Sequence, residues 1–319
     1  MPVFALVEGF HLCHVLATLE RLGILESLES GASARRLATR HQVDLEVLQA
    51  ALDFLAARTE LVTHRSGQYY LPRRYDAKAR FLLLQYIGAY GRNVVDLARI
   101  LRTPSSATGL IDRRQHAKAF AQITSADANL LADIVSQLGL NHVLDLGCGT
   151  GTLLLRLGNA RRDFIGWGLD NNPWMCTIAR KCAATSLLKG RVKILQGDCR
   201  RLRSIPLGIT REVRNITAAN VCNEFFAGGT RRAVKWLRDV KAQFPGRTLL
   251  IADYCSVLGT SRPCQGEIAL HDFVQVISGQ GLPPSTLEGW KRIYRAARCH
   301  LIHAVEMRHT PYFVHVLRL

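Results

Sequence analysis

Three closely spaced glycines, Gly147, Gly149 and Gly151, directly follow the apolar run VLDL at residues 143–146. Glycine lets a backbone turn tightly and approach a ligand closely. The helix expected to begin just after Gly151 would present unpaired N–H groups in its first turn. Because parallel strands end together at one edge of a sheet, this pattern predicts a ligand-binding loop at that carboxyl edge.

Three aspartates accompany the glycine loop. Asp145, two residues before the first glycine, is expected under the loop, where its carboxylate can accept from loop amides or, through water, from an ammonium group. Asp170 ends the next predicted strand, FIGWGLD, where a carboxylate can accept from both hydroxyls of a ribose. Asp198 ends a third, VKILQGD, in a position to accept from an adenine amino group. The loop GCGTG lacks the GxGxxG spacing built around a pyrophosphate, which disfavours a dinucleotide.

This set of residues resembles the class I S-adenosylmethionine-dependent methyltransferases. The resemblance implies that Asp145 and the three glycines form the family's first motif, that Asp170 binds the ribose, and that Asp198 with Cys199 contacts the adenine. S-adenosyl-L-methionine is therefore the expected cofactor. The remaining predicted cofactor contacts are Asn171 and Asn220.

The chain as a whole resembles the dimeric O-methyltransferases of plant and bacterial secondary metabolism. In that family a histidine after the fourth strand is the general base that deprotonates a hydroxyl. Here the corresponding run is NVCNEFFAGG, residues 220–229, and the position of that histidine falls on or near Phe226. The usual base is therefore missing, so the acceptor would be an ionised phenol, a neutral amine, a carboxylate, a sulfur or an activated carbon, or another side chain would serve as base.

Three residues are the predicted catalytic candidates. Asn223 can orient a substrate through amide hydrogen bonds, and Glu224 can bind a cation or act as an alternative base. The run HDFVQVISG supplies His271, on a helix that the resemblance places at the acceptor pocket. Each also has a purely structural interpretation: a strand end with a capped helix for the first two, and an amphipathic helix for His271.

The elements that must position these residues change character along the chain. Residues 1–76 combine helical periodicity with a short hairpin at 61–72, which predicts a winged-helix-like dimerisation domain. Residues 77–138 read as a helical linker and lid, with TPSSATG as a breaker and 116–138 as a clear amphipathic stretch. From 139 to 319 strands and helices alternate, which predicts an α/β Rossmann-like, doubly wound catalytic domain ending in an antiparallel hairpin.

Composition bounds the cellular setting and the partners. The N-terminal run MPVFALVEGFHLCHVL has no basic leader or cleavage site, so we expect no secretory signal, no membrane span and a cytoplasmic location. The nine cysteines form no CxxC pair and are expected to be mostly buried thiols, and the histidines show no metal-binding pattern. The formal charge of +17 favours an acidic partner, such as an anionic or carrier-bound acceptor, or alternatively reflects a basic solvated surface.

The resulting hypothesis is a homodimeric S-adenosylmethionine-dependent methyltransferase acting on a small molecule in specialised metabolism. One alternative uses the same pocket to transfer or cyclise the aminocarboxypropyl group of the cofactor. A second is a nucleic-acid methyltransferase or a cofactor-sensing nucleic-acid-binding protein. The second is disfavoured because DLEVLQAALDFLAA, the expected groove-facing helix, carries three acids and no basic residue.

Overall fold

A computed structural model describes residues 2–71, 75–123, 126–184, 188–260, 266–307 and 310–319. The chain divides into two compact units, one formed by Met1–Arg92 with Arg114–Ile123 and the other by Asn93–Arg113 with Thr124–Leu319. The residues predicted as a linker, 77–138, are thus shared between both units.

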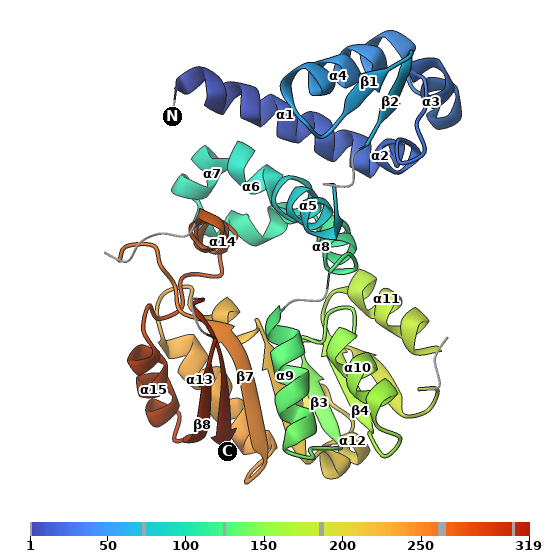
Figure 1. The fold of residues 1–319 in the computed structure, drawn as a ribbon. Coiled ribbons are helices and arrows are strands. Elements are labelled where there is room, and N and C mark those ends of the chain that lie inside the picture. Colours follow the sequence, from blue (N-terminus) through green and yellow to red (C-terminus); the bar gives the residue numbers. More distant parts are fainter. Residues whose placement is uncertain (1, 72–74, 124–125, 185–187, 261–265, 308–309) are drawn as a thin grey trace. The chain divides into compact units, whose positions relative to one another are not determined.

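The first unit is mainly helical and carries one two-stranded antiparallel sheet (Figure 1). Ser33 and Asp44 accept a hydrogen bond from the backbone of the first turn of α3 and α4, which explains where these helices begin. The order helix, helix, hairpin predicted for 33–71 is present, and Pro72 of the predicted hairpin lies outside the described residues. The elements, of which α6 and α8 cross between units, are α1 (Val3–Arg21), α2 (Ile24–Ser27), α3 (Ala34–His41), α4 (Leu45–Arg58), β1 (Thr63–Arg65), β2 (Gln68–Tyr70), α5 (Ala77–Leu82), π-helix η1 (Leu83–Ala89), α6 (Gly91–Val95) and α8 (Arg113–Phe120).

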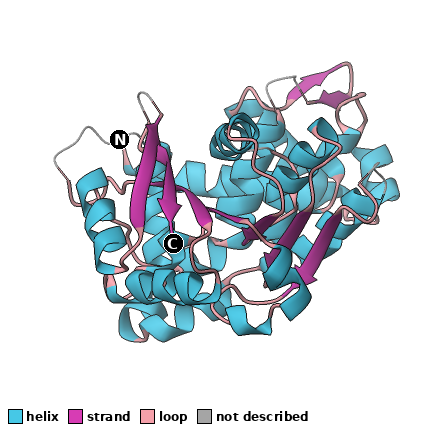
Figure 2. Ribbon diagram, turned by 90° about the horizontal axis from the view of Figure 1, so that it is seen from below, coloured by secondary structure: helices cyan, strands magenta, loops and turns pink. Residues whose placement is uncertain are grey.

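The second unit contains a seven-stranded sheet of order β5-β4-β3-β6-β7-β9-β8. The strands are parallel except β9, which is antiparallel to both β7 and β8. The predicted doubly wound sheet and terminal hairpin are both present, and Figure 2 shows β8 and β9 at one end of the sheet. The elements are α7 (Leu97–Arg102), 3-10 helix η2 (Pro104–Leu110), α9 (Ala126–Gln137), β3 (Val143–Leu146), α10 (Thr152–Ala160), β4 (Gly166–Asp170), α11 (Pro173–Ala184), β5 (Val192–Gln196), η3 (Leu202–Ser204), α12 (Leu207–Glu212), β6 (Asn215–Ala219), η4 (Cys222–Phe225), α13 (Arg231–Gln243), β7 (Thr248–Tyr254), α14 (Gly266–Ile277), α15 (Leu287–Ala296), β8 (His300–Glu306) and β9 (Tyr312–Arg318).

Helices cover both faces of this sheet. One apolar cluster joins α9, α10 and α11 to one face, and a second joins α13 and α15 to the other (Figure 1). Alternate residues of one strand therefore enter different clusters, as Val143 and Leu144 do. Burial on both faces explains why the central strands read as continuous apolar runs.

One prediction for the connecting region was confirmed and one was wrong. The breaker TPSSATG follows the end of α7 at Arg102 and lies in no α-helix; its residues from Pro104 on belong to the 3-10 helix η2, in which Ala107 and Leu110 are buried beside Ile100 and Ile277. The stretch 116–138 is two helices, because α8 ends at Phe120 and α9 begins at Ala126. The helical spacing of apolar residues continues across this break. The sequence pattern therefore predicted which faces are buried but not where the helix is interrupted.

Candidate cofactor and acceptor site

The glycine loop after β3 adopts backbone conformations that side chains disfavour. Gly147, Gly149 and Gly151 have φ of 67°, 54° and 79°. A Cβ on Gly147 would lie 2.4 Å from Cγ2 of Val221, and one on Gly151 would lie 3.2 Å from Cβ of Ala179. Packing and φ therefore both require glycine at position 147. At Gly151 the positive φ is the main requirement and packing is only tight, whereas Gly149 has its nearest neighbour at 4.0 Å. The middle of the loop is where a ligand has room to approach.

Asp145 lies beneath this loop and is almost fully buried, with 4% of its surface exposed. Its Oδ1 accepts a hydrogen bond of 2.7 Å from the hydroxyl of Thr217 on β6, a partner that was not among the predicted ones, which were loop amides or, through water, an ammonium group. Burial raises the pKa of Asp145 to about 7, against the Thr217 hydrogen bond and helped by the charge of Asp170. The carboxylate is therefore a group that a cation nearby would ionise.

Asp170, at the end of β4, is held by two backbone donors. The amide of Gly149 donates to Oδ2 at 2.9 Å, and the amide of Asn172 donates to Oδ1 at 2.7 Å. Burial raises the pKa of Asp170, while these amides and the charge of Arg113 act in the opposite direction. A carboxylate offers about four acceptor positions, so both oxygens retain capacity for further donors such as ribose hydroxyls.

The residues after Asp170 form the start of α11. Asn172 accepts from the amide of Trp174 at 3.1 Å and precedes Pro173, the first residue of the helix, as expected for an N-cap followed by proline. Arg113 reaches this segment from α8, since its guanidinium donates to the side chain of Asn171 and its carbonyl accepts from Asn172. Asn171 thus lies beside Asp170 but is already engaged by a distant arginine.

Asp198 follows β5 and is paired with Arg200 two residues later. The amide and Nε of Arg200 donate to Oδ1 at 2.9 and 2.8 Å, and Nη2 lies 2.7 Å from Oδ2. Partial burial acts to raise the pKa of Asp198, but the hydrogen bonds and charge of Arg200 hold it below its usual value. Cys199 is fixed through its carbonyl, which accepts from the indole of Trp236 at 3.1 Å. Burial raises the pKa of its thiol to about 12.

The segment after β6 carries three more of the predicted residues. Asn220 has φ of 52°, and its amide donates to the carbonyl of Ala252 at 2.8 Å. Asn223 is 3% exposed, and its amide donates to Oδ2 of Asp253 at 3.0 Å. The side-chain oxygen of Asn223 is buried and receives no hydrogen bond from any described residue. Phe226, at the position of the missing histidine, is buried against Trp290.

Glu224 lies on this same segment. Part of its surface is exposed to solvent, but the protein surrounds its carboxylate closely enough to reduce its hydration. Desolvation raises the pKa of Glu224 to about 7, helped by the charges of Asp170 and Asp198 and opposed by those of Arg200 and Arg113. No described side chain or amide donates a hydrogen bond to this carboxylate. The structure thus brings Glu224 into electrostatic reach of both cofactor acids, and a carboxyl that titrates near neutral pH suits proton transfer.

His271 lies on α14, apart from these acids along the chain. Its ring packs edge-on against Tyr254, the last residue of β7, with centroids 5.0 Å apart. Tyr254 is itself fully buried. This contact places His271 at the end of β7.

Three residues of this site escaped the sequence analysis. Thr217 and Arg113 act on residues more than fifty positions away, so no local spacing announces them. Arg200 had a local signal, since an arginine two residues after an aspartate can bend back onto it. No cluster of three or more metal-ligating side chains occurs in the part of the chain that the structure describes.

The residues present fit S-adenosylmethionine. The glycine loop leaves space at Gly149, α10 begins without a side-chain cap, and Asp170 keeps acceptor capacity directly beside that loop. Asp198 lies at the neighbouring strand end. Donors for a carboxylate, acceptors for hydroxyls and an ionisable Asp145 therefore meet at one sheet edge.

Comparison with known proteins agrees with this fit. Residues 143–238 match the family model described as a methyltransferase domain. A ribosomal protein L11 methyltransferase of Desulfotalea psychrophila is 32% identical over 106 residues, which is 33% of this chain. The chain spans only about a third, 32%, of that relative's length.

Solved structures resemble the chain over nearly its whole length. The mitomycin 7-O-methyltransferase MmcR has a TM-score of 0.77 at 17% identity, with 99% of this chain and 96% of that one covered. PigF, solved with S-adenosylhomocysteine (SAH), has 0.74 at 17%, covering 99% and 98%. A putative O-methyltransferase from Nostoc punctiforme has 0.73 at 16%, covering all of both chains (100% and 100%). These likenesses show that both units have the fold of O-methyltransferases.

Proposed function

We propose that this chain, a class I S-adenosylmethionine-dependent enzyme by its matched methyltransferase domain and its fold, methylates a small molecule of specialised metabolism. The observation that carries the proposal is the glycine loop held to Asp170 at the ends of adjacent strands. The acceptor class is supported by the printed activity of MmcR, a mitomycin 7-O-methyltransferase.

The cofactor, when bound, supplies an electrophilic methyl group on a sulfonium. The chain's own residues would bind and orient it: Asp170 would accept from the ribose hydroxyls and Asp198 from the adenine amino group, and amides of the glycine loop and of the start of α10 would donate to its carboxylate. Asp145, with its raised pKa, favours an ammonium group above it. Positioning the two reactants in line supplies much of the rate enhancement in a direct displacement.

We propose Glu224 as the base that replaces the missing histidine. Its pKa of about 7 lets it accept a proton at neutral pH, and the absence of a described hydrogen-bond donor leaves its carboxylate available. Asn223 would orient the acceptor through its side-chain amide, whose oxygen receives no hydrogen bond from a described residue. His271, whose ring packs against Tyr254, is the competing base and is tested beside Glu224.

Calorimetric titration with S-adenosylmethionine and SAH tests the cofactor. Wild type should bind both at micromolar concentration, Asp170→Ala should lose binding, and Asp163→Ala, which changes an exposed acid paired with Arg161, should retain it. Mass analysis of the nucleoside left after incubation with phenol, amine and carboxylate acceptors identifies the chemistry. Release of methylthioadenosine instead of SAH would overturn methyl transfer in favour of aminocarboxypropyl chemistry.

We propose that the cytoplasmic form is a homodimer joined through α1. One run of this helix leaves large apolar side chains at least half exposed, although its Glu8 pairs with Arg58 and its Leu16 and Leu19 are buried. By length and composition α1 could also cross a membrane. The exposed side chains are Val3 (74%), Phe4 (71%), Leu6 (52%), Val7 (50%) and Phe10 (50%).

Sedimentation velocity distinguishes these roles of α1. The double variant Phe4→Asp, Val7→Asp should sediment as a monomer, and Val47→Asp, at a 70% exposed position on α4, should remain a dimer. A wild-type monomer that pellets with lipid vesicles would refute the dimer and indicate a membrane anchor.

A further inference from the structure

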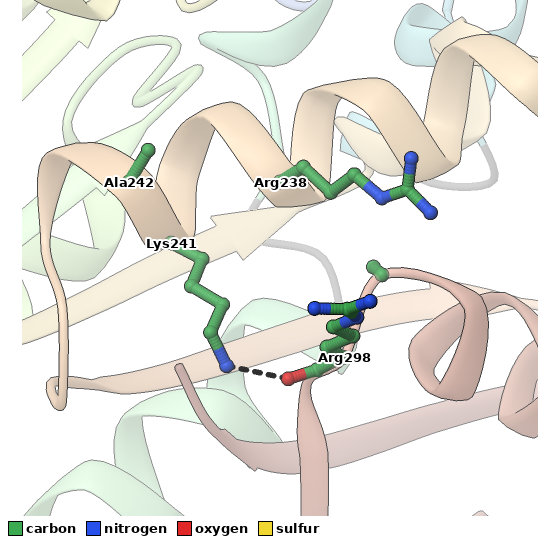
Figure 3. Close-up of a pocket in the computed structure, with 5 residues that line it drawn as sticks. Arg238, Lys241, Ala242 and Arg298 are labelled. Atoms are coloured by element: carbon green, nitrogen blue, oxygen red, sulfur yellow. Dashed lines mark hydrogen bonds between the residues drawn. The ribbon is translucent and has the colours of Figure 1, made fainter.

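A hollow in the second unit is lined by cations and lies away from the cofactor loop. Arg238, Lys241 and Ala242 of α13, with Ala297 and Arg298 from the turn between α15 and β8, line a space of about 430 Å³. Figure 3 shows the side chains of Arg238 and Lys241 extending from α13, with a dashed line from the ammonium of Lys241 to the carbonyl oxygen of Arg298. We call this hollow the amino-edge cation pocket, because it lies at the edge of the sheet where the parallel strands begin.

Hydrogen bonds to backbone carbonyls hold two of its cations in place. Nη2 of Arg238 donates to the carbonyl of Ala296 at 2.7 Å, and Nζ of Lys241 donates to the carbonyl of Arg298 (Figure 3). Each uses one of its N–H groups in this way, so an arginine keeps four donors and a lysine two. Ala242 and Ala297 are small and leave the hollow open.

The charge in this pocket is not neutralised. None of Arg238, Lys241 and Arg298 pairs with a carboxylate among the described residues. The acids on the same helices have other partners: Asp239 lies 2.5 Å from Lys235, and Glu288 is paired with Arg295. Three cations without a carboxylate partner around one hollow repel one another. A bound anion would reduce this repulsion, so the pocket favours an anion strongly.

The pocket lies at the opposite edge of the sheet from the cofactor loop. His300, two residues after Arg298, begins β8 and pairs with Arg318, which pairs with Thr248, the first residue of β7. The candidate site lies at the other end of the same parallel strands. A strand of this length spans about 20 Å, so an occupant of this pocket cannot be the methyl acceptor.

We propose that the amino-edge cation pocket binds the phosphoryl groups of a small anion, a role separate from methyl transfer. Guanidinium groups match phosphate oxygens in geometry, and a lysine adds a point charge. The volume favours a small molecule over a polymer, since small-ligand sites measure roughly 300–1,000 Å³ and polymers need an extended basic track. The overall charge of +17 would raise the local concentration of such a ligand.

Calorimetric titration of the full chain with inorganic pyrophosphate at constant ionic strength tests the proposal. Changing Arg238, Lys241 and Arg298 together to Gln should weaken binding at least about tenfold. The matched control changes three exposed cations elsewhere in this unit, Arg162→Gln, Lys193→Gln and Arg211→Gln, and should bind as wild type. Arg298→Gln alone should also weaken binding. Because the Arg298 side chain makes no hydrogen bond to a described residue, this variant separates ligand binding from folding.

The outcomes either support or overturn this site. Loss of binding confined to the pocket variants supports it. Equal weakening in the control set would mean general attraction to a basic surface, and no binding by wild type would remove the site. Dependence of RNA or duplex DNA binding, rather than pyrophosphate binding, on these residues would also overturn the small-ligand assignment. S-adenosylmethionine binding, measured in parallel, reports on the proposed methyltransferase site independently.

Discussion

The ends of β4 and β5 differ from the segment after β6 in how fully their polar groups are satisfied. Asp170 accepts from two amides and Asp198 from Arg200, so both carboxylates are held before any ligand arrives. After β6, the side-chain oxygen of Asn223 and the carboxylate of Glu224 receive no hydrogen bond from a described residue. The difference supports the proposal of a preorganised cofactor half at the ends of β4 and β5 and of an acceptor half after β6 whose polar groups would be completed by the ligand.

The largest effect is expected from Asp170→Ala. Losing charge-assisted hydrogen bonds to the ribose, and the acceptor of the Gly149 amide, should weaken S-adenosylmethionine about a thousandfold. Calorimetry measures this change, with Asp163→Ala as the control. A loss below about tenfold would mean that this strand end is not preorganised for the cofactor.

Glu224→Gln should lower kcat about a hundredfold and leave the Kd of S-adenosylmethionine unchanged. Because the pKa of Glu224 is about 7, its carboxylate is mostly protonated at pH 6 and ionised at pH 8, so wild-type kcat should rise across that range. The variant should lose this rise. The exposed Glu212→Gln should keep it, and a rise that disappears only in His271→Ala would assign the base to His271.

The free energy of unfolding of Asp145→Asn, relative to that of wild type, should rise by about 2 kcal/mol between pH 5 and pH 8. The folded pKa of Asp145, about 7, exceeds its value of 3.8 in the unfolded chain. Its favourable contribution is therefore complete below about pH 4 and is lost as pH rises to about 7. Urea denaturation of the ligand-free protein should show Asp145→Asn gaining stability relative to wild type over this range, and a parallel pH dependence would contradict the raised pKa.

Asp198→Asn should have the smallest effect, about a tenfold loss of S-adenosylmethionine affinity. Arg200 already uses much of the acceptor capacity of this carboxylate, so only a single contact to the adenine amino group is at stake. Calorimetry beside Asp170→Ala ranks the two strand ends. Equal losses in both variants would mean that the Arg200 pairing opens on binding.

In the proposed cofactor half, the positions of the residues in the fold could be predicted from the sequence, while their roles remain predictions. Gly147 and Asp170 stand at fixed distances from apolar strands, and Asn172 and Pro173 form a local cap, so nearby residues were sufficient. The partners Thr217 and Arg113 were hidden because folding, not spacing, brings them to Asp145 and Asn171.

The acceptor half gave a weaker signal for the same reason. Glu224 could be named as a candidate, but its raised pKa depends on Asp170, Asp198, Arg113 and Arg200, which arrive from other parts of the chain. The break after Phe120 was also missed, because the apolar periodicity of α8 continues into α9 and gives no local sign of the interruption.

The contact between Gly147 and Val221 limits how this protein can diversify. Val221 belongs to the segment that carries Glu224, and its Cγ2 occupies the space that a Cβ of Gly147 would need. A lineage that adapts to a new acceptor by enlarging residue 221 would push on the loop that binds the cofactor. Substrate range should therefore evolve through other walls of the pocket, while residue 221 stays small, and a directed-evolution library gains by leaving it unchanged.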